Sequence, residues 1–181
     1  SALHDMDAVQ VFTEVQAPPP QMVIFGAGED ARPLARCAAD AGFRVAVVDH
    51  RPAYLGTDWY PASTRLIQAR PGDRVGDLTF GPRTYAVVKT HMLAHDRDWI
   101  AALLASDVPY IGVLGPRARI DEMRQQLGAE GDERVFGPVG LDVGADGPDQ
   151  IALSIVAEVL SVYSQREPRH LRDREGVIHA G

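Results

Sequence analysis

The glycines of the segment GAGEDA, residues 26 to 31, have the spacing of a phosphate-binding turn. Gly26 permits a tight bend, and Gly28 lets the backbone approach a ligand because no Cβ stands in the way. Ala31 holds the third position of the G-x-G-x-x-G/A pattern, where a small residue allows close packing of helix on strand. The segment therefore predicts that Gly26, Ala27 and Gly28 bind a nucleotide or dinucleotide, with the phosphate at the helix N-terminus.

The acidic residues near this turn give opposite indications about nucleotide binding. Asp49 follows Gly28 by about 20 residues, at the position where a carboxylate binds a ribose 2′-OH. Glu29 and Asp30 lie in the first helical turn, where they suit the helix dipole but would repel a pyrophosphate. The alternative is a turn that serves only close packing and binds nothing.

Further candidate side chains follow other apolar runs. Arg51 could bind a phosphate or a ribose 2′-phosphate, or form an ion pair with a nearby acid. Thr90 and His91 end one apolar run, and Gly115 ends the next. His91 could act as a general acid or base, or bond a neighbouring backbone group. The aromatic residues after Arg51 could cover an adenine or pterin ring, or act as packing caps.

No catalytic or metal-binding pattern accompanies these candidates. His91 and His95 are four residues apart but span a strand end and a helix start, without a cysteine or HExxH context, so we expect no metal site. The sequence has no P-loop, nucleophile elbow or Ser-His-Asp signature. Cys37 lies among alanines within the first predicted helix and fits a small apolar residue better than a reactive thiol. We therefore expect a binding site without catalytic residues.

Alternating strands and helices must position the candidate residues. Apolar runs predict strands over 22–25, 45–48, 65–68, 85–88 and 110–114. Periodic patterns predict one helix after the glycine turn and others over 96–106, 116–127 and from Pro148 onward. This alternation predicts an α/β fold, a Rossmann-like doubly wound parallel sheet in a single domain. All the candidates follow predicted strands, and in such sheets ligands bind beyond the carboxyl ends of the strands, where the strand order reverses.

We expect three segments along the chain. Residues 1–20 form an N-terminal arm or edge strand, residues 21–166 the nucleotide-binding domain, and residues 167–181 a charged tail. The arm includes a predicted strand at 9–15 and should dock on the domain edge or on a second protomer. Residues 130–139 are expected to be a connector without regular structure.

Composition narrows the class of protein. A chain of 181 residues with 45% hydrophobic content can bury the core of one domain. A net charge of -7 provides no basic field for nucleic acid or anionic lipid. No apolar run is long enough to cross a membrane, and a single cysteine favours a reducing cytoplasm. The chain opens on Ser1, as a processed or cloned fragment would, so an upstream domain stays an open alternative.

Four segments occur in a specific order: GAGEDARPLARCAADAGFRVAVVDHRP, VVKTHMLAHDRDWIAALL, YIGVLGPRARIDEM and GPVGLDVGADGPDQIALSIVAEVL. Together they resemble the C-terminal Rossmann domain of the XdhC/CoxI family, the accessory proteins of xanthine dehydrogenase and carbon monoxide dehydrogenase. The resemblance covers roughly residues 9 to 166. Two departures are Glu29, where the family usually has histidine, and the upstream cysteine-bearing domain of longer members, which is absent here.

The resemblance implies a chaperone that binds the molybdenum cofactor, supports its sulfuration and hands it to an apo-molybdoenzyme. The cofactor, as molybdopterin or its cytosine dinucleotide form, carries a phosphate and, when extended, a ribose. By resemblance, ligand binding is assigned to the glycine turn and the strand ends, namely Gly26, Gly28, Asp49, Arg51, Thr90, His91 and Gly115. We also expect a homodimer. The alternatives are an NAD(P)-dependent oxidoreductase with His91 as its acid or base, and a nucleotide-sensing regulatory domain.

Overall fold

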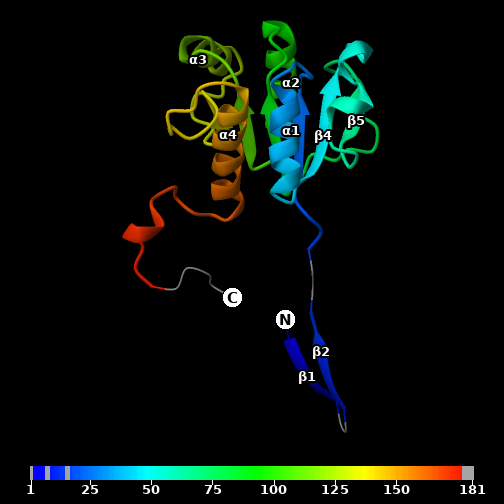
Figure 1. Cartoon of the computed structure of the whole chain (residues 1–181), viewed down its shortest axis with the longest axis vertical. Helices are drawn as coiled ribbons and strands as arrows, with labels where there is room; N and C mark the ends of the chain where they lie inside the picture. Colours follow the sequence, from blue (N-terminus) through cyan, green and yellow to red (C-terminus); the bar gives the residue numbers. More distant parts are fainter. Residues whose placement is uncertain (1, 7–8, 15–16, 177–181) are drawn as a thin grey trace.

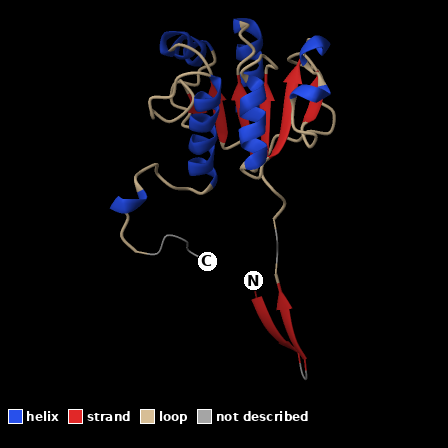
Figure 2. Cartoon of the chain, viewed as in Figure 1, coloured by secondary structure: helices blue, strands red, loops and turns tan. Residues whose placement is uncertain are grey.

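The computed structural model describes residues 2–6, 9–14 and 17–176. Its main body is a six-stranded parallel sheet with helices on both faces (Figures 1 and 2). The strands are β3 (Gln21–Phe25), β4 (Arg44–Asp49), β5 (Arg65–Gln68), β6 (Thr84–Val88), β7 (Tyr110–Val113) and β8 (Val135–Phe136). The helices are α1 (Ala31–Asp40), α2 (Leu93–Leu104), α3 (Arg117–Gln126) and α4 (Pro148–Tyr163).

The strand order is β5-β4-β3-β6-β7-β8. Along the chain, β4 and β5 are added on one side of β3, and β6, β7 and β8 on its other side. Strand β3 pairs in parallel with β4 on one side and with β6 on the other. The order therefore reverses between β3 and β6, which makes the carboxyl ends of these two strands the switch point of the sheet. This topology confirms the predicted Rossmann-like, doubly wound α/β fold.

Two apolar layers hold the sheet between its helices. Successive side chains of a strand point to opposite faces, so Met22 and Ile24 of β3 join the layer beneath α1 and α4. Val23 and Phe25 join the opposite layer, which α2 and α3 cover. There the Phe25 and Trp99 rings pack with centroids 4.4 Å apart. Burial on both faces explains why the strands read as continuous apolar runs.

The boundaries of three elements differ from the sequence prediction. Helix α2 begins at Leu93 and not at Asp96, because the Met92 carbonyl already accepts a helical hydrogen bond from the Asp96 N–H. Pro116 precedes α3 with an extended ψ of 141° and is not its first helical residue. The segment predicted as a connector contains β8, whose two residues are too few to produce a periodic pattern.

The N-terminal arm contains a two-stranded antiparallel sheet of its own. Strands β1 (Ala2–Met6) and β2 (Val9–Thr13) pair with each other and not with the six-stranded sheet. Val15, the end of the predicted strand, lies outside the described residues. The proline spacer is tied to the main body, since the Pro18 carbonyl accepts from Arg83 and the Pro20 carbonyl accepts from the Arg44 backbone.

Three short 3-10 helices complete the described chain: η1 (Pro52–Tyr54), η2 (Thr57–Trp59) and η3 (Leu171–Asp173). The first two lie in the aromatic loop, residues 51–63, and the third lies in the charged tail, whose last residues 177–181 are outside the described part. None of the helices that the structure describes combines the length and the apolar character needed to cross a bilayer.

Candidate functional site

The glycine turn lies at the switch point, in contact with the ends of both neighbouring strands. The Gly26 N–H donates to the Val48 carbonyl of β4, and the Lys89 N–H after β6 donates to the Phe25 carbonyl. Gly26 has a φ of 110°, and an added Cβ would lie 2.4 Å from the Lys89 carbonyl oxygen. Only glycine fits this close approach of two backbones.

Gly28 faces a small polar space. A Cβ added there would lie 2.9 Å from Asp30 Oδ1, 3.8 Å from His91 Nε2 and 3.9 Å from Lys89 Nζ. We call these four residues, Gly28, Asp30, Lys89 and His91, the switch-point site. Asp30 and Lys89 also line a cavity of about 40 Å³ between α1 and α4, which has room for a few water molecules at most.

Lys89 is a functional candidate that the sequence analysis did not select. Its side chain is only 2% exposed, and its Nζ lies 2.5 Å from Asp30 Oδ1. Burial lowers the pKa of Lys89, while Asp30, and more weakly Asp49 and Asp96, oppose that change by stabilising the ammonium. A signal for it was present: Lys89 is the only lysine of the chain and directly follows an apolar strand.

The structure corrects the placement of Glu29 and Asp30 in the first helical turn. Helix α1 begins at Ala31 and has no acid in its first turn, because residues 28–31 form a separate turn closed by the Ala31 N–H on the Gly28 carbonyl. Asp30 still lies at the helix N-terminus, where its charge would oppose a phosphate. In the structure that charge is paired with the Lys89 ammonium. The ion pair therefore offsets the electrostatic objection to phosphate binding, but it also occupies the lysine that a phosphate would need.

His91 lies at the exposed rim of the same site. Its backbone has a φ of 61°, which is uncommon for a residue other than glycine and typical of strained functional positions. The ring is 61% exposed, and its Nε2 lies 3.7 Å from Asp30 Oδ2. Asp30 therefore lies between a buried cation and an exposed imidazole.

Asp49 connects the glycine turn to β4 in a different way. Its carboxylate accepts from the Ala27 N–H at 2.8 Å, from the Arg51 N–H at 2.9 Å, and from Arg51 Nε and Nη2 at 3.0 and 2.9 Å. Burial would raise the pKa of Asp49, but the hydrogen bonds from Arg51 and Ala27 outweigh it and lower the pKa to about 2.

This arrangement limits what Asp49 and Arg51 can do as they stand. Both carboxylate oxygens are engaged, and Arg51 forms the ion pair with a nearby acid that was one of its two expected roles. Binding of a ribose by Asp49, or of a phosphate by Arg51, stays a prediction and would require the guanidinium to move. What the geometry displays is a carboxylate that fixes the glycine turn against the end of β4.

The aromatic loop covers the outer side of the turn. The Arg51 guanidinium lies 4.0 Å from the Tyr54 ring centroid, and Arg32 of α1 lies 4.0 Å from the Trp59 ring centroid. Tyr60 is buried, and its hydroxyl donates to the Ala27 carbonyl at 3.4 Å. Both Tyr54 and Trp59 keep about two fifths of their surface exposed, so their rings pack on arginines and still face solvent.

Thr90 and Gly115 belong to a second network on the other side of β6. The fully buried Asp96 accepts from the Thr90 N–H at 2.9 Å and from Thr90 Oγ1 at 2.6 Å, and it pairs with Arg119. Gly115 adopts a φ of 150°, and a Cβ added to it would lie 3.9 Å from Arg119 Nη1. The Thr90 hydroxyl thus shapes the loop, and the contacts of this network are with Asp96, Met92 and Arg119.

The histidine pair noted in the sequence is divided in the structure. His95 packs against His50, with ring centroids 4.9 Å apart, while His91 faces Asp30. Among the residues that the structure describes, no three His, Cys, Asp or Glu side chains gather as metal ligands would. Burial, and to a lesser extent Asp40, raise the pKa of the half-buried Cys37, which disfavours a reactive thiolate.

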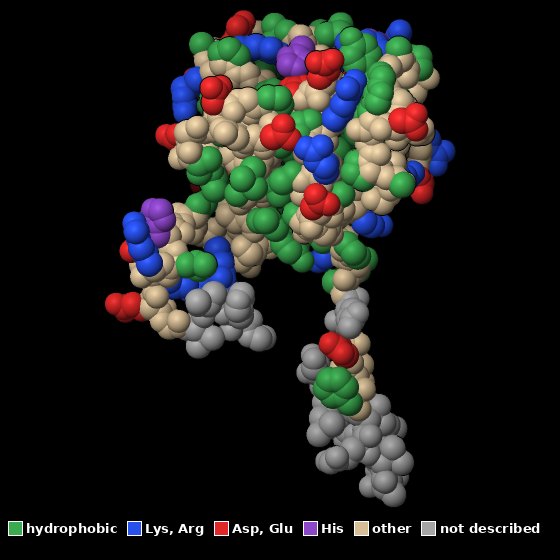
Figure 3. Space-filling view, viewed as in Figure 1, with side chains coloured by type: hydrophobic (Ala, Val, Ile, Leu, Met, Phe, Trp, Pro, Cys, Tyr) green, Lys and Arg blue, Asp and Glu red, His purple; other side chains and the backbone are tan. Residues whose placement is uncertain are grey.

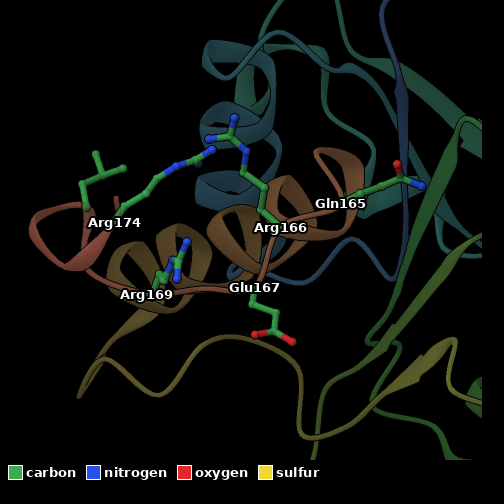
Figure 4. Close-up of a pocket in the computed structure, with 6 residues that line it drawn as sticks. Gln165, Arg166, Glu167, Arg169 and Arg174 are labelled. Carbon is green, nitrogen blue, oxygen red and sulfur yellow. The ribbon is translucent and has the colours of Figure 1, made fainter. Parts of the chain in front are cut away.

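A second pocket lies away from the switch-point site. It lies between the end of α4 and η3 and is lined by Gln165, Arg166, Glu167, Arg169, Leu171 and Arg174 (Figure 4). Every one of these side chains comes from a single ten-residue segment, and none is among the predicted site residues. Across the face drawn in Figure 3, acidic and basic side chains are interspersed.

Comparison with known proteins places this geometry in a family. A probable xanthine dehydrogenase subunit of Bacillus subtilis (strain 168) is 39% identical over 157 residues, which is 87% of this chain and 47% of that protein. The uncharacterized protein YqeB of Escherichia coli (strain K12) is 33% identical over 161 residues, 86% of this chain and 29% of that protein. The chain therefore spans less than half the length of these relatives.

Structural comparison agrees. The crystal structure of a xanthine dehydrogenase from Bacillus halodurans matches with a TM-score of 0.76 and 31% identity, over 83% of this chain and 44% of that one. The family described as the XdhC Rossmann domain matches residues 22–159, from within β3 to within α4. The chain belongs to the XdhC family, of which it contains the Rossmann domain.

Proposed function

We propose that this chain is the Rossmann part of an accessory protein that binds the molybdenum cofactor and hands it to an apo-molybdoenzyme of the xanthine dehydrogenase or carbon monoxide dehydrogenase type. Membership of the XdhC family and the name of the Bacillus subtilis relative support the link to xanthine dehydrogenase. The observation that carries the binding role is the buried Lys89 cation beside the glycine turn at the switch point.

The residues of the switch-point site fit the phosphate end of such a cofactor. The glycine turn leaves open the space that a Cβ would fill at Gly28, and the Lys89 ammonium borders that space. Backbone N–H groups of the turn and a lysine are the donors that phosphates prefer. Gly28 and Lys89 would hold the phosphate, because the N–H groups of Gly26 and Ala27 already donate to Val48 and Asp49. Thr90, His91 and Gly115 are second candidates farther along the edge.

The pterin would extend toward the aromatic loop, where Tyr54 and Trp59 are partly exposed. Flat rings of this kind suit stacking on a pterin or a cytosine. When bound, the cofactor supplies the metal chemistry of the recipient enzyme. The role of this chain is to bind the cofactor, orient it and shield it from water.

Handover requires a partner surface beside the site. Met92 and Leu93 are exposed apolar residues that directly follow His91, and we assign contact with the apo-enzyme to them. For the proposed homodimer, the exposed apolar residues Leu153, Leu160 and Tyr163 of α4 offer a separate surface. We assign the handover to the cytoplasm. A chain with a single cysteine cannot form an internal disulfide, so it gains no stability from an oxidising compartment.

The proposal is tested by identifying the small molecules that co-purify with the protein. The chain is purified from a host that makes molybdenum cofactor and is then denatured, and the released molecules are assayed by oxidised-pterin fluorescence and by mass. We expect stoichiometric pterin. Bound NAD(P) without pterin would contradict the cofactor role and favour an oxidoreductase or a nucleotide sensor, and a protein without either ligand would contradict binding by this part of the chain.

A further inference from the structure

We propose that Lys89 is the counter-ion for the ligand phosphate at the switch-point site and that Asp30 is an internal anion which holds this lysine until the ligand displaces it. The inference rests on the proposed function for the identity of the ligand. It adds how the ligand gains access to the lysine: in the ligand-free protein the site is occupied by a carboxylate of the chain itself, which the phosphate must displace.

The hydrogen bonding of Lys89 is the first observation. An ammonium has three N–H donors, and a buried one needs acceptors for them. Within the residues that the structure describes, the Lys89 ammonium donates one hydrogen bond, to Asp30 Oδ1 at 2.5 Å, although its side chain is only 2% exposed. A phosphate, with several acceptor oxygens, would complete this set better than one carboxylate oxygen does.

The position of the Asp30 carboxylate is the second observation. Asp30 Oδ1 lies 2.9 Å from the point where a Cβ of Gly28 would stand, so the carboxylate occupies the space that this glycine leaves open. The cavity that Asp30 and Lys89 line beside it measures about 40 Å³, and its other lining residues are apolar. A phosphate that takes the place of the carboxylate on Lys89 therefore requires Asp30 to turn away.

Asp30 has a second partner to which it can turn. His91 Nε2 lies 3.7 Å from Asp30 Oδ2, on the solvent side of the site. The Asp30 side chain is one third exposed, so it has a solvent-facing side toward which it can turn. The backbone strain of His91 is consistent with a residue held in place for such a contact.

The choice of lysine supports exchange over permanent pairing. The chain has 18 basic residues, of which Lys89 alone is lysine. The guanidinium of arginine binds a carboxylate through two parallel hydrogen bonds, as Arg51 binds Asp49 here, whereas lysine is a point charge with rotatable donors. A single lysine at this one position fits a cation that must change partners.

The test measures binding of inorganic pyrophosphate by isothermal titration calorimetry at pH 7 and constant ionic strength. Asp30→Asn keeps an acceptor for Lys89 but removes the competing charge, and we expect it to bind pyrophosphate at least tenfold more tightly than the parent. Glu29→Gln is the matched control. It removes the same charge one residue earlier, from an exposed side chain with no hydrogen bond or ion pair among the described residues, and should change affinity less than threefold.

The role of the lysine is tested in the Asp30→Asn background. Adding Lys89→Met should abolish the gain in affinity. Equal affinity of Asp30→Asn and the parent, a loss of affinity, an equal gain in Glu29→Gln, or a gain that survives Lys89→Met would each overturn the proposal.

If the double variant does not fold, the comparison of Asp30→Asn with Glu29→Gln decides alone. The outcome is also separable from the proposed function. A tenfold gain in a protein that never carries pterin would leave the phosphate site standing and refute the cofactor role. Stoichiometric pterin with no gain in Asp30→Asn would do the reverse.

Discussion

Two aspartates flank the glycine turn, and they have opposite surroundings. Asp49 is buried and accepts four hydrogen bonds, from the Ala27 backbone and from Arg51. Asp30 is one third exposed, accepts one hydrogen bond from Lys89 and has His91 as a more distant neighbour. The same residue type is thus fixed by four donors on one side of the turn and held by a single donor on the other, where we propose exchange.

The two glycines of the turn differ in the same way, one being fixed against backbone and the other facing a flexible side chain. Substitution of Gly26 should cause the largest loss of stability. Gly26→Ala would place a Cβ 2.4 Å from the Lys89 carbonyl with an unfavourable φ, so we expect a loss of about 4 kcal/mol in unfolding free energy. Gly28→Ala meets only the flexible end of Asp30 and should cost less than about 1 kcal/mol. Urea unfolding measures both, and equal losses would contradict the division.

Removal of the buried carboxylate comes next in size. Asp49→Asn leaves Arg51 without its ion pair and weakens the bond to the Ala27 N–H, so we expect a loss of about 3 kcal/mol. Pyrophosphate should stabilise Asp49→Asn by the same amount as the parent, because Asp49 binds protein donors and does not compete with the ligand. Asp142→Asn, on an exposed loop, is the control and should change stability by less than about 0.5 kcal/mol. A larger stabilisation by pyrophosphate in Asp49→Asn than in the parent would show that Asp49 is exchangeable as well.

The pH dependence of stability gives a further test of the role of Asp49. The pKa of Asp49 is lowered from 3.8 to about 2 in the folded state, so the carboxylate stabilises the fold above pH 4. That contribution, roughly 2.5 kcal/mol, should be lost as the pH falls from about 4 to about 2. Thermal unfolding of the parent should show this loss, and Asp49→Asn should show less of it. An identical slope in both proteins would place the acid sensitivity elsewhere.

The smallest effect is expected at the exchangeable acid. Asp30→Asn weakens the pairing of a buried lysine but keeps an acceptor, so we expect a loss of about 1 to 2 kcal/mol. At one fixed pyrophosphate concentration, the ligand should stabilise Asp30→Asn more than it stabilises the parent or Asp49→Asn, because Asp30→Asn binds it more tightly. A thermal shift assay with and without pyrophosphate measures this difference. An equal shift in Asp30→Asn and the parent would count against exchange.

Much of the fold could be predicted because its signals are local. Strands buried on both faces produce short apolar runs, and the glycine turn follows the first of them. Strand β8 was missed because two residues are too few to show a periodic pattern. Helix α2 begins earlier than predicted, with the hydrogen bond from the Asp96 N–H to the Met92 carbonyl. These departures depend on contacts that a local pattern does not contain.

The site was less predictable for the same reason. The sequence located the turn and the strand ends, but it treated Asp30 only as a repulsive charge, because its partner Lys89 is 59 residues away. It left Arg51 with two roles, and the bidentate pair with Asp49 is a feature of side-chain geometry. Pairings across the switch point follow from the strand order, which the sequence alone did not specify.

The most direct test of a phosphate site at the switch point is a crystal structure of the protein with pyrophosphate. We predict a phosphate oxygen within hydrogen-bonding distance of Lys89 Nζ, Asp30 turned toward His91, and the contacts of Asp49 with Ala27 and Arg51 unchanged. Pyrophosphate bound elsewhere, with Asp30 still on Lys89, would contradict the account.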